Sequence, residues 1–172
     1  MTETQSEEDA RFEADPFEKQ WMVISLALLI AFMLTVTIAG FALGFQVPGR
    51  ETRVDPKTVA DSAPWNEPGL RDRGNGEYDA YVIARQYVFD PRTITVPVGS
   101  SVTFYVTSTD VQHGFKLQNT NVNMQVVPGE VSKLTMEFDE VGEFDYICNE
   151  FCGAGHAAMA GSVIVEADTG GG

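Results

Sequence analysis

The chain is short of basic residues, cysteine and histidine, and these shortages narrow its function. Its 172 residues include 11 lysines and arginines against 25 aspartates and glutamates, a formal net charge of −14. Nucleic-acid-binding proteins use lysine and arginine to neutralise phosphates, so this balance argues against a nucleic-acid partner. It also argues against a basic helix lying on a membrane surface. Only two cysteines and two histidines are present, so most of what the sequence says about chemistry depends on them.

Lysine is especially scarce, and an acidic, lysine-poor surface has two interpretations. It could attract a basic partner protein over long distances. It could instead adapt the chain to concentrated salt, where the screening length falls to about 3 Å at 1 M and long-range attraction is nearly lost. The acidic residues are spread along the chain, so we favour salt adaptation.

Charge is absent altogether from residues 21–45, a run of mostly apolar positions. As a helix this run would be about 37 Å long, enough to cross a hydrocarbon core of about 30 Å. A signal peptide would need a basic leading segment and a shorter apolar run, whereas residues 1–20 are acidic. We therefore predict a retained transmembrane helix over 21–45, and the few basic residues on its flanks do not orient it.

Beyond the predicted helix, the pattern divides the chain into a linker, a β domain and a short tail. Residues 46–77 are rich in proline and glycine and are expected to be irregular linker. Residues 78–168 contain short runs of alternating polarity with turn residues between them, and 169–172 form a glycine-rich tail. The expected strands cover 78–84, 93–98, 101–108, 131–138, 143–148 and 161–166. The fold class predicted from this pattern is all-β, an antiparallel Greek-key sandwich or small barrel.

The residues able to bind a metal are gathered in one short motif, CNEFCGAGHAAM, with one histidine far upstream. The motif places Cys148, Cys152, His156 and Met159 within twelve residues, and His113 precedes it. Thiolate, imidazole and thioether together suit copper, and one cysteine, two histidines and a methionine would complete a one-copper blue site. Cys148 is then a surplus thiolate. Two thiolates can bridge two copper ions, with one histidine for each ion and a weak axial donor, Met159 or a backbone carbonyl, completing each.

Other chemistries fit the motif less well. The two cysteines could form a disulfide, but the histidine and methionine that follow favour a metal. A Cys2His2 zinc site would not need Met159 and usually has different spacings. A thiol oxidoreductase would need a shorter cysteine spacing and a βαβ pattern. Gly153 and Gly155 favour a tightly folded loop over a helix.

With these residues assembled, the chain resembles subunit II of haem-copper terminal oxidases, whose binuclear copper-A site has this motif with an upstream HGF. Nitrous-oxide reductases share the motif. Most such subunits have two N-terminal helices, whereas this chain has one, as in the single-helix ba3-type class. The segments RVDP (53–56), APW (63–65) and NTNVN (119–123) are also similar to that class.

The resemblance implies a cupredoxin fold, a cytoplasmic N-terminus and a copper domain outside the cell membrane. It implies that Cys148 and Cys152 bridge both coppers, and that each copper takes one histidine and one weak donor. The pairs would be His113 with Met159, and His156 with the main-chain carbonyl of Glu150. In many relatives the side chain at position 150 also touches magnesium, and that role is left open for Glu150.

The implied function is electron transfer. The subunit would accept an electron from a soluble donor, a cytochrome c or a small blue-copper protein. It would pass the electron to a haem in subunit I, where oxygen is reduced and protons are moved; a small additional helix subunit is a further expected partner. Tyr87, with Phe89 as second choice, is expected where electrons enter, and His156 on the exit side. A membrane-anchored copper-delivery module is the main alternative, while a complete nitrous-oxide reductase would need more histidines than the chain has.

Overall fold

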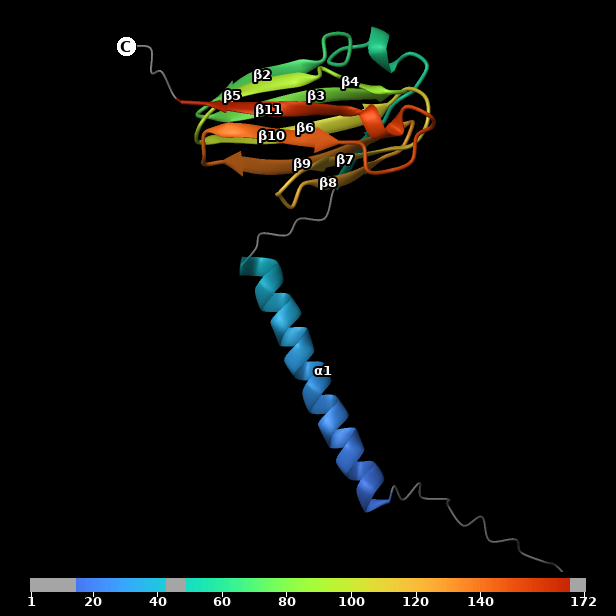
Figure 1. Cartoon of the computed structure of the whole chain (residues 1–172), viewed down its shortest axis with the longest axis vertical. Helices are drawn as coiled ribbons and strands as arrows, with labels where there is room; N and C mark the ends of the chain where they lie inside the picture. The colour runs from blue at the N-terminus through green and yellow to red at the C-terminus, as the bar shows by residue number, and fades with distance from the viewer. Residues whose placement is uncertain (1–14, 43–48, 168–172) are drawn as a thin grey trace, which may run out of the picture. The chain divides into compact units, whose positions relative to one another are not determined.

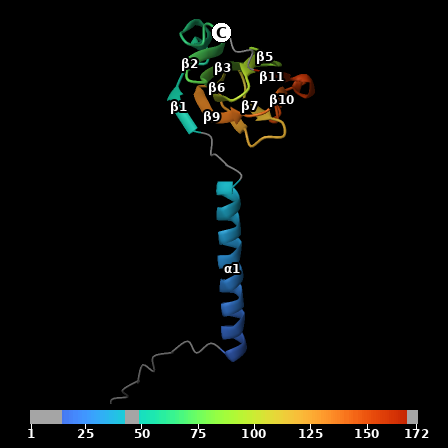
Figure 2. The same ribbon diagram turned by 90° about the vertical axis from the view of Figure 1, so that its left-hand side faces the viewer.

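The computed structural model describes residues 15–42 and 49–167, in two compact units divided after Phe45 (Figures 1 and 2). The first unit contains a helix and the second a β-sandwich. The expected acidic segment 1–20 lies mostly outside the described residues, and so do the end of the predicted helix at 43–45 and the tail at 169–172.

Helix α1 (Pro16–Ala42) is the one described helix long and apolar enough to cross a membrane. It begins five residues before the predicted start because a capping box forms between Asp15 and Glu18. The Phe17 N–H donates to Asp15 Oδ1 at 2.8 Å, and Glu18 Oε2 accepts from the Asp15 N–H at 3.1 Å. Proline at the first helical position needs no N–H partner. The 27 residues span about 40 Å.

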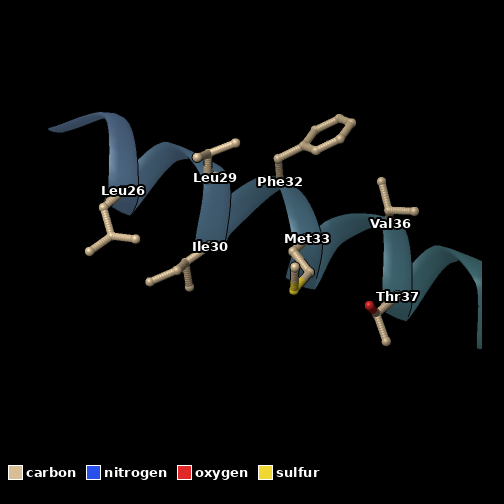
Figure 3. A pocket seen from close by; sticks show the side chains of 7 residues that line it. All are labelled: Leu26, Leu29, Ile30, Phe32, Met33, Val36 and Thr37. Atoms are coloured by element: carbon tan, nitrogen blue, oxygen red, sulfur yellow. The ribbon is translucent and has the colours of Figure 1, made fainter. Parts of the chain in front are cut away.

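From Trp21 onward, the surface of α1 is largely apolar around its whole circumference. A shallow groove between its side chains is lined by Leu26, Leu29, Ile30, Phe32, Met33, Val36 and Thr37 (Figure 3). All the large apolar side chains of the helix are exposed within its own unit. A helix that is hydrophobic on every side requires lipid or other apolar helices around it. This fits the membrane anchor predicted from the sequence.

The β unit is a sandwich of two sheets. One sheet has the order β1-β9-β6-β3-β2, with β4 paired to β3. Its strands are β1 (Gly49–Arg53), β2 (Gly69–Gly74), β3 (Glu77–Arg85), β4 (Val88–Asp90), β6 (Ser100–Ser108) and β9 (Glu130–Phe138). The other sheet has the order β5-β11-β10-β7-β8. Its strands are β5 (Thr93–Pro97), β7 (His113–Leu117), β8 (Asn123–Val126), β10 (Gly142–Ile147) and β11 (Ala160–Glu166).

The all-β sandwich is confirmed, but two of its strand pairs are parallel. β3 runs parallel to β6, and β5 runs parallel to β11, whereas we expected antiparallel pairs throughout. Alternation along a strand shows which side chains are buried and says nothing about the direction of the neighbouring strand. In both cases the chain crosses to the opposite sheet between the two partners, which a local pattern does not reveal.

Part of the expected linker belongs to the sandwich. Within residues 46–77, β1 pairs with β9 and β2 pairs with β3. A 3-10 helix (Val59–Asp61) and Trp65 cover the outer face of the first sheet. Trp65 is 5% exposed and meets Tyr81 edge-on, with ring centroids 5.2 Å apart. The sequence pattern did not predict these strands, because they are short and lie among prolines and glycines that are typical of turns.

The core between the sheets is rich in aromatic rings. Phe89, Phe104, Phe115 and Tyr146 are fully buried, and the Phe115 and Tyr146 ring centroids are 4.8 Å apart. Burial of one such side chain contributes about 1.5–3 kcal/mol. The cluster extends to the end of the sandwich where β10 finishes and where His113 begins β7.

Gly161 in β11 provides a test of this packing. A Cβ at Gly161 would overlap the Arg92 carbonyl oxygen and the Tyr146 ring, whereas a Cβ at Gly142 on the paired strand would lie 3.7 Å from its nearest atom. We expect Gly161→Ala to lower the free energy of unfolding by about 1–3 kcal/mol. Gly142→Ala should change it by less than about 0.5 kcal/mol. Denaturant unfolding of the detergent-solubilised chain measures both, and equal effects would contradict the packing described here.

Candidate metal centre

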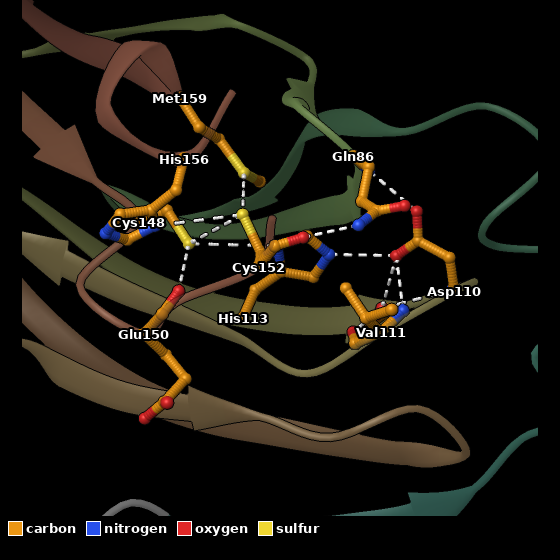
Figure 4. Close-up of polar contacts among 10 residues, drawn as sticks. Gln86, Asp110, Val111, His113, Cys148, Glu150, Cys152, His156 and Met159 are labelled. Atoms are coloured by element: carbon orange, nitrogen blue, oxygen red, sulfur yellow. Dashed lines mark hydrogen bonds and ion pairs between the residues drawn. The ribbon is translucent and has the colours of Figure 1, made fainter. Parts of the chain in front are cut away.

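The side chains predicted to bind metal lie close together (Figure 4). They gather where β7 begins and β10 ends. His113 is the first residue of β7, and Cys148 follows the last residue of β10. Cys152 lies in the loop, His156 opens a short 3-10 helix (His156–Ala158), and Met159 precedes β11. Residues 148–159 are therefore the hairpin loop between two paired strands.

The hairpin holds the two ends of this loop together. Ile147 and Ala160 are the last paired residues of β10 and β11. One step further, the Cys148 N–H donates to the Met159 carbonyl at 3.0 Å. The backbones of the first and last candidate ligands are thus fixed to each other by the sheet.

Distances between the candidate donor atoms are short. The two Sγ atoms of Cys148 and Cys152 are 3.8 Å apart, nearly twice a disulfide bond of about 2.05 Å, and both thiols are free. His113 Nδ1 lies 3.7 Å from Cys148 Sγ, and His156 Nδ1 lies 3.7 Å from Cys152 Sγ. Met159 Sδ lies 3.8 Å from Cys152 Sγ. The structure thus brings both histidines and Met159 next to the two cysteine sulfurs.

A main-chain oxygen completes the group. The Glu150 carbonyl oxygen is 3.2 Å from Cys148 Sγ. Gly114 makes this approach possible, because a Cβ there would overlap the Asn149 side chain and the Glu150 nitrogen. Asn149 also donates to Asn123 Oδ1 at 3.0 Å, which fixes the backbone next to Glu150.

The donor set fits two copper ions better than one zinc ion. An ion about 2.3 Å from each sulfur fits between sulfurs 3.8 Å apart. The set offers two thiolates, two imidazole nitrogens, a thioether and a carbonyl, and the first three kinds are ligands that copper accepts. Zinc in a Cys2His2 site would leave Met159 and the Glu150 carbonyl unused.

Burial shields most of the group from water. His113, Cys148, Cys152 and Met159 are each no more than 5% exposed, while His156 is partly exposed. Desolvation raises the pKa of the Cys152 thiol to about 11, and the neighbouring Cys148 thiol adds to that rise. In the metal-free protein this thiol is protonated at neutral pH.

The His113 ring is oriented by a carboxylate that sequence reasoning missed. His113 Nε2 lies 2.9 Å from Asp110 Oδ1, which leaves Nδ1 facing the sulfurs. Burial opposes ionisation of Asp110, but hydrogen bonds from His113, the Gln86 N–H and the Val111 N–H outweigh it and lower the pKa of Asp110. Gln86 was also missed, and its side-chain amide donates to the Cys152 carbonyl. The sequence TDVQH places the carboxylate three residues before the histidine, the one clue to this contact.

The two aromatic residues expected where electrons enter have different positions. Tyr87 is 39% exposed and lies against the ligand loop, where a Cβ on Gly155 would come within 2.5 Å of its ring. Phe89 is fully buried between Phe115 and Tyr146 and does not reach the surface. Of the two, only Tyr87 is placed to meet a partner.

The Glu150 side chain is exposed and lines a polar recess of about 220 Å³. The recess is formed by Gly114, Asn123, Met124, Gln125, Asn149 and Glu150. Glu150 is the one carboxylate in this lining, so magnesium would need further ligands from elsewhere.

Comparison with known proteins identifies the family. The family profile described as "Cytochrome C oxidase subunit II, periplasmic domain" matches residues 72–167. Cytochrome c oxidase subunit 2 of Thermus thermophilus is 40% identical over 154 residues, which cover 87% of this chain and 92% of that protein. The chain belongs to the cytochrome c oxidase subunit II family. The resemblance to the single-helix ba3-type class is thereby confirmed.

Solved structures and a second enzyme group agree with this assignment. A chain of a haem-copper terminal oxidase dimer, solved by cryo-electron microscopy, is 34% identical with a TM-score of 0.72, and the match covers 87% of this chain and 99% of that one. Nitrous-oxide reductase of Stutzerimonas stutzeri is 33% identical over 98 residues, only 15% of its own length. The protein is thus a membrane-anchored electron-transfer subunit of an oxidase complex, with a binuclear copper-A centre.

The buried thiol makes copper binding depend on pH. Copper binds thiolate, so a copper ion held by Cys152 would displace the thiol proton, whose pKa is about 11. We expect the apparent copper affinity to rise by about tenfold per pH unit for each proton released between about pH 7 and 9. Chelator competition at several pH values measures this slope. A flat profile would show that the thiols are already ionised in the metal-free protein.

Proposed function

We propose that Cys148 and Cys152 bridge two copper ions, that His113 and Met159 complete one site, and that His156 and the Glu150 carbonyl complete the other. The observation that carries this proposal is the pair of free sulfurs 3.8 Å apart with an imidazole nitrogen 3.7 Å from each. Met159 and the Glu150 carbonyl approach the same pair as weak donors.

The chain's part in electron transfer is to keep these donors still. When bound, the copper pair takes up and releases one electron that both ions share. The sheet fixes Cys148 to Met159 through a 3.0 Å hydrogen bond, and Asp110 fixes the His113 ring. Donors that move little between two charge states keep the reorganisation energy low, and burial excludes water that would otherwise reorient.

The two histidines have different access to partners. His113 has no exposed surface, whereas His156 is partly exposed and lies beside Phe151, which is 76% exposed, with ring centroids 5.8 Å apart. We assign the His156 edge to electron release toward a haem in subunit I. We assign electron acceptance to the Tyr87 surface, from a soluble cytochrome c or small blue-copper protein.

The remaining assignments concern the membrane and the other subunits. The family profile is that of a periplasmic domain. We therefore place the β unit outside the cell membrane, α1 across it and residues 1–20 in the cytoplasm. The apolar surface of α1 would contact lipid, the haem-bearing subunit and a small helix subunit where the complex contains one.

A copper-delivery role fits the site less well. Delivery requires ligands that exchange with a partner, and an exposed site favours such exchange. Here both thiols are at most 5% exposed, and the donor set is closed by the sheet. These features favour retention of the metal.

The two-copper assignment is tested by replacing one bridging thiol. The full chain in detergent, loaded with copper, should bind two ions and give a paramagnetic resonance signal from one electron shared by two copper nuclei. Cys148→Ser removes a bridge and should abolish that signal. Met159→Leu removes only a weak donor and should keep the two-nucleus signal while shifting the reduction potential. A one-nucleus hyperfine pattern in the unaltered chain would overturn the assignment.

Charge is distributed unevenly between the two ends of the sandwich. The segments that form the metal site, residues 85–92, 109–113 and 148–159, contain two basic and three acidic residues: Arg85, Arg92, Asp90, Asp110 and Glu150. At the other end of β10, about 20 Å away, residues 139–143 contain three acidic residues and no basic one. Acidity that served to guide a basic donor would surround the metal end. The distribution therefore supports salt adaptation over donor steering.

Salt dependence tests this interpretation. We expect the rate of electron transfer from a cytochrome c or a small blue-copper protein to change by less than about threefold between about 0.01 and 0.15 M salt. A steered association would fall by about tenfold or more over that range. Glu140→Lys, a charge reversal at the far end, should leave the rate unchanged in stopped-flow measurements. A steep fall of the electron-transfer rate with salt would contradict salt adaptation and support donor steering.

A further inference from the structure

Gln86 lies outside the ligand set, in the turn between β3 and β4, yet it contacts two parts of the metal centre (Figure 4). Its side-chain amide donates to the main-chain carbonyl of Cys152. Its main-chain N–H donates to Asp110 Oδ2 at 2.6 Å. Asp110 in turn lies 2.9 Å from His113 Nε2. A continuous path of hydrogen bonds therefore joins the backbone of one thiol ligand to the ring of one histidine ligand.

We propose that Gln86 is a positioning residue for the copper pair, which sets the place of the Cys152 thiolate relative to His113. The proposal rests on the ligand assignment made above. Cys152 lies in the hairpin loop and His113 in β7, and 38 residues separate them along the chain. Their separation depends on contacts across the end of the sandwich, and the Gln86 path is one that reaches both.

The fit of the Gln86 side chain against the ligand loop supports this role. Its amide nitrogen would lie 2.9 Å from a Cβ at Gly153, and Gly153 has a φ of +127°, which side-chain-bearing residues rarely adopt. The loop backbone therefore passes close enough for the amide to reach the Cys152 carbonyl. A glutamate at position 86 would present an ionised oxygen to that carbonyl and repel it.

Loss of the hydrogen bond between the Gln86 side chain and the Cys152 carbonyl should make the ligand geometry of the two copper positions less equal. On the ligand assignment above, Cys152 would bind both ions, so a small movement of its backbone would change the fit of both ions. Outer contacts of metal ligands typically change metal affinity by about 10–100-fold when they are removed. A residue with a merely structural role would lower the unfolding temperature and leave the spectrum and the potential unchanged.

The test uses Gln86→Met in the full copper-loaded chain in detergent. Methionine matches the length of glutamine, lacks the donor and keeps the main-chain N–H that binds Asp110. We expect two coppers per chain, an affinity about tenfold lower in chelator competition, a shifted reduction potential and unequal hyperfine coupling to the two nuclei. Gln86→Glu should have a larger effect than Gln86→Met.

Gln118→Met is the matched control, because it makes the same chemical change on an exposed residue in the turn after β7. It should leave copper affinity, potential and hyperfine coupling unchanged. If Gln86→Met also leaves all three unchanged while the unaltered chain shows the two-nucleus signal, the positioning role is wrong and the ligand assignment stands. If the unaltered chain lacks that signal, the ligand assignment itself fails.

Discussion

The 3.8 Å separation of two free sulfurs is the constraint on which the rest of this structure depends. A disulfide would need them nearly 2 Å closer, and a wider gap would prevent one ion from binding both. The hairpin of β10 and β11 fixes the ends of the loop that carries them, through six residue pairs and the hydrogen bond from the Cys148 N–H to the Met159 carbonyl. The sandwich thus serves as a rigid frame for one short loop, and its aromatic core lies directly beneath that loop.

The sandwich holds the two histidines differently: His113 is buried, whereas His156 is partly exposed. His113 is buried at the start of a strand, with its second nitrogen held by Asp110. His156 sits in a short 3-10 helix of the loop, next to an exposed phenylalanine. A buried, fixed ligand keeps the geometry of the site constant, whereas a ligand at the surface can contact another protein. The site therefore combines a rigid side chain, His113 in β7, with one that a partner protein can reach, His156 in the loop.

The sequence predicted the parts of this structure that depend on local pattern. The six strands expected from alternation are all present, and the motif together with the upstream His113 identified every side chain that the structure brings around the sulfur pair. β7 was missed although it carries His113, because its run HGFKL is short and begins with a histidine and a glycine. The parallel pairs, the strands within 46–77, and Asp110 and Gln86 were also missed. Each of these depends on which segments meet in space, and that information is not contained in the spacing of residues along the chain.

Burial of the thiols also explains why this centre would retain its metal. In the metal-free protein a pKa of about 11 keeps the Cys152 thiol neutral, because a lone thiolate would be poorly solvated there. Bound copper would supply the positive charge that stabilises the thiolate in the same place. Release of copper would therefore require both a proton to reach the sulfur and a buried site to open. Since the strands on both sides of the loop are paired, opening would break sheet contacts as well as metal bonds. A site in which metal release requires both thiol protonation and opening of the hairpin suits repeated electron transfer at a fixed metal. It is less suited to exchange of the metal with a partner.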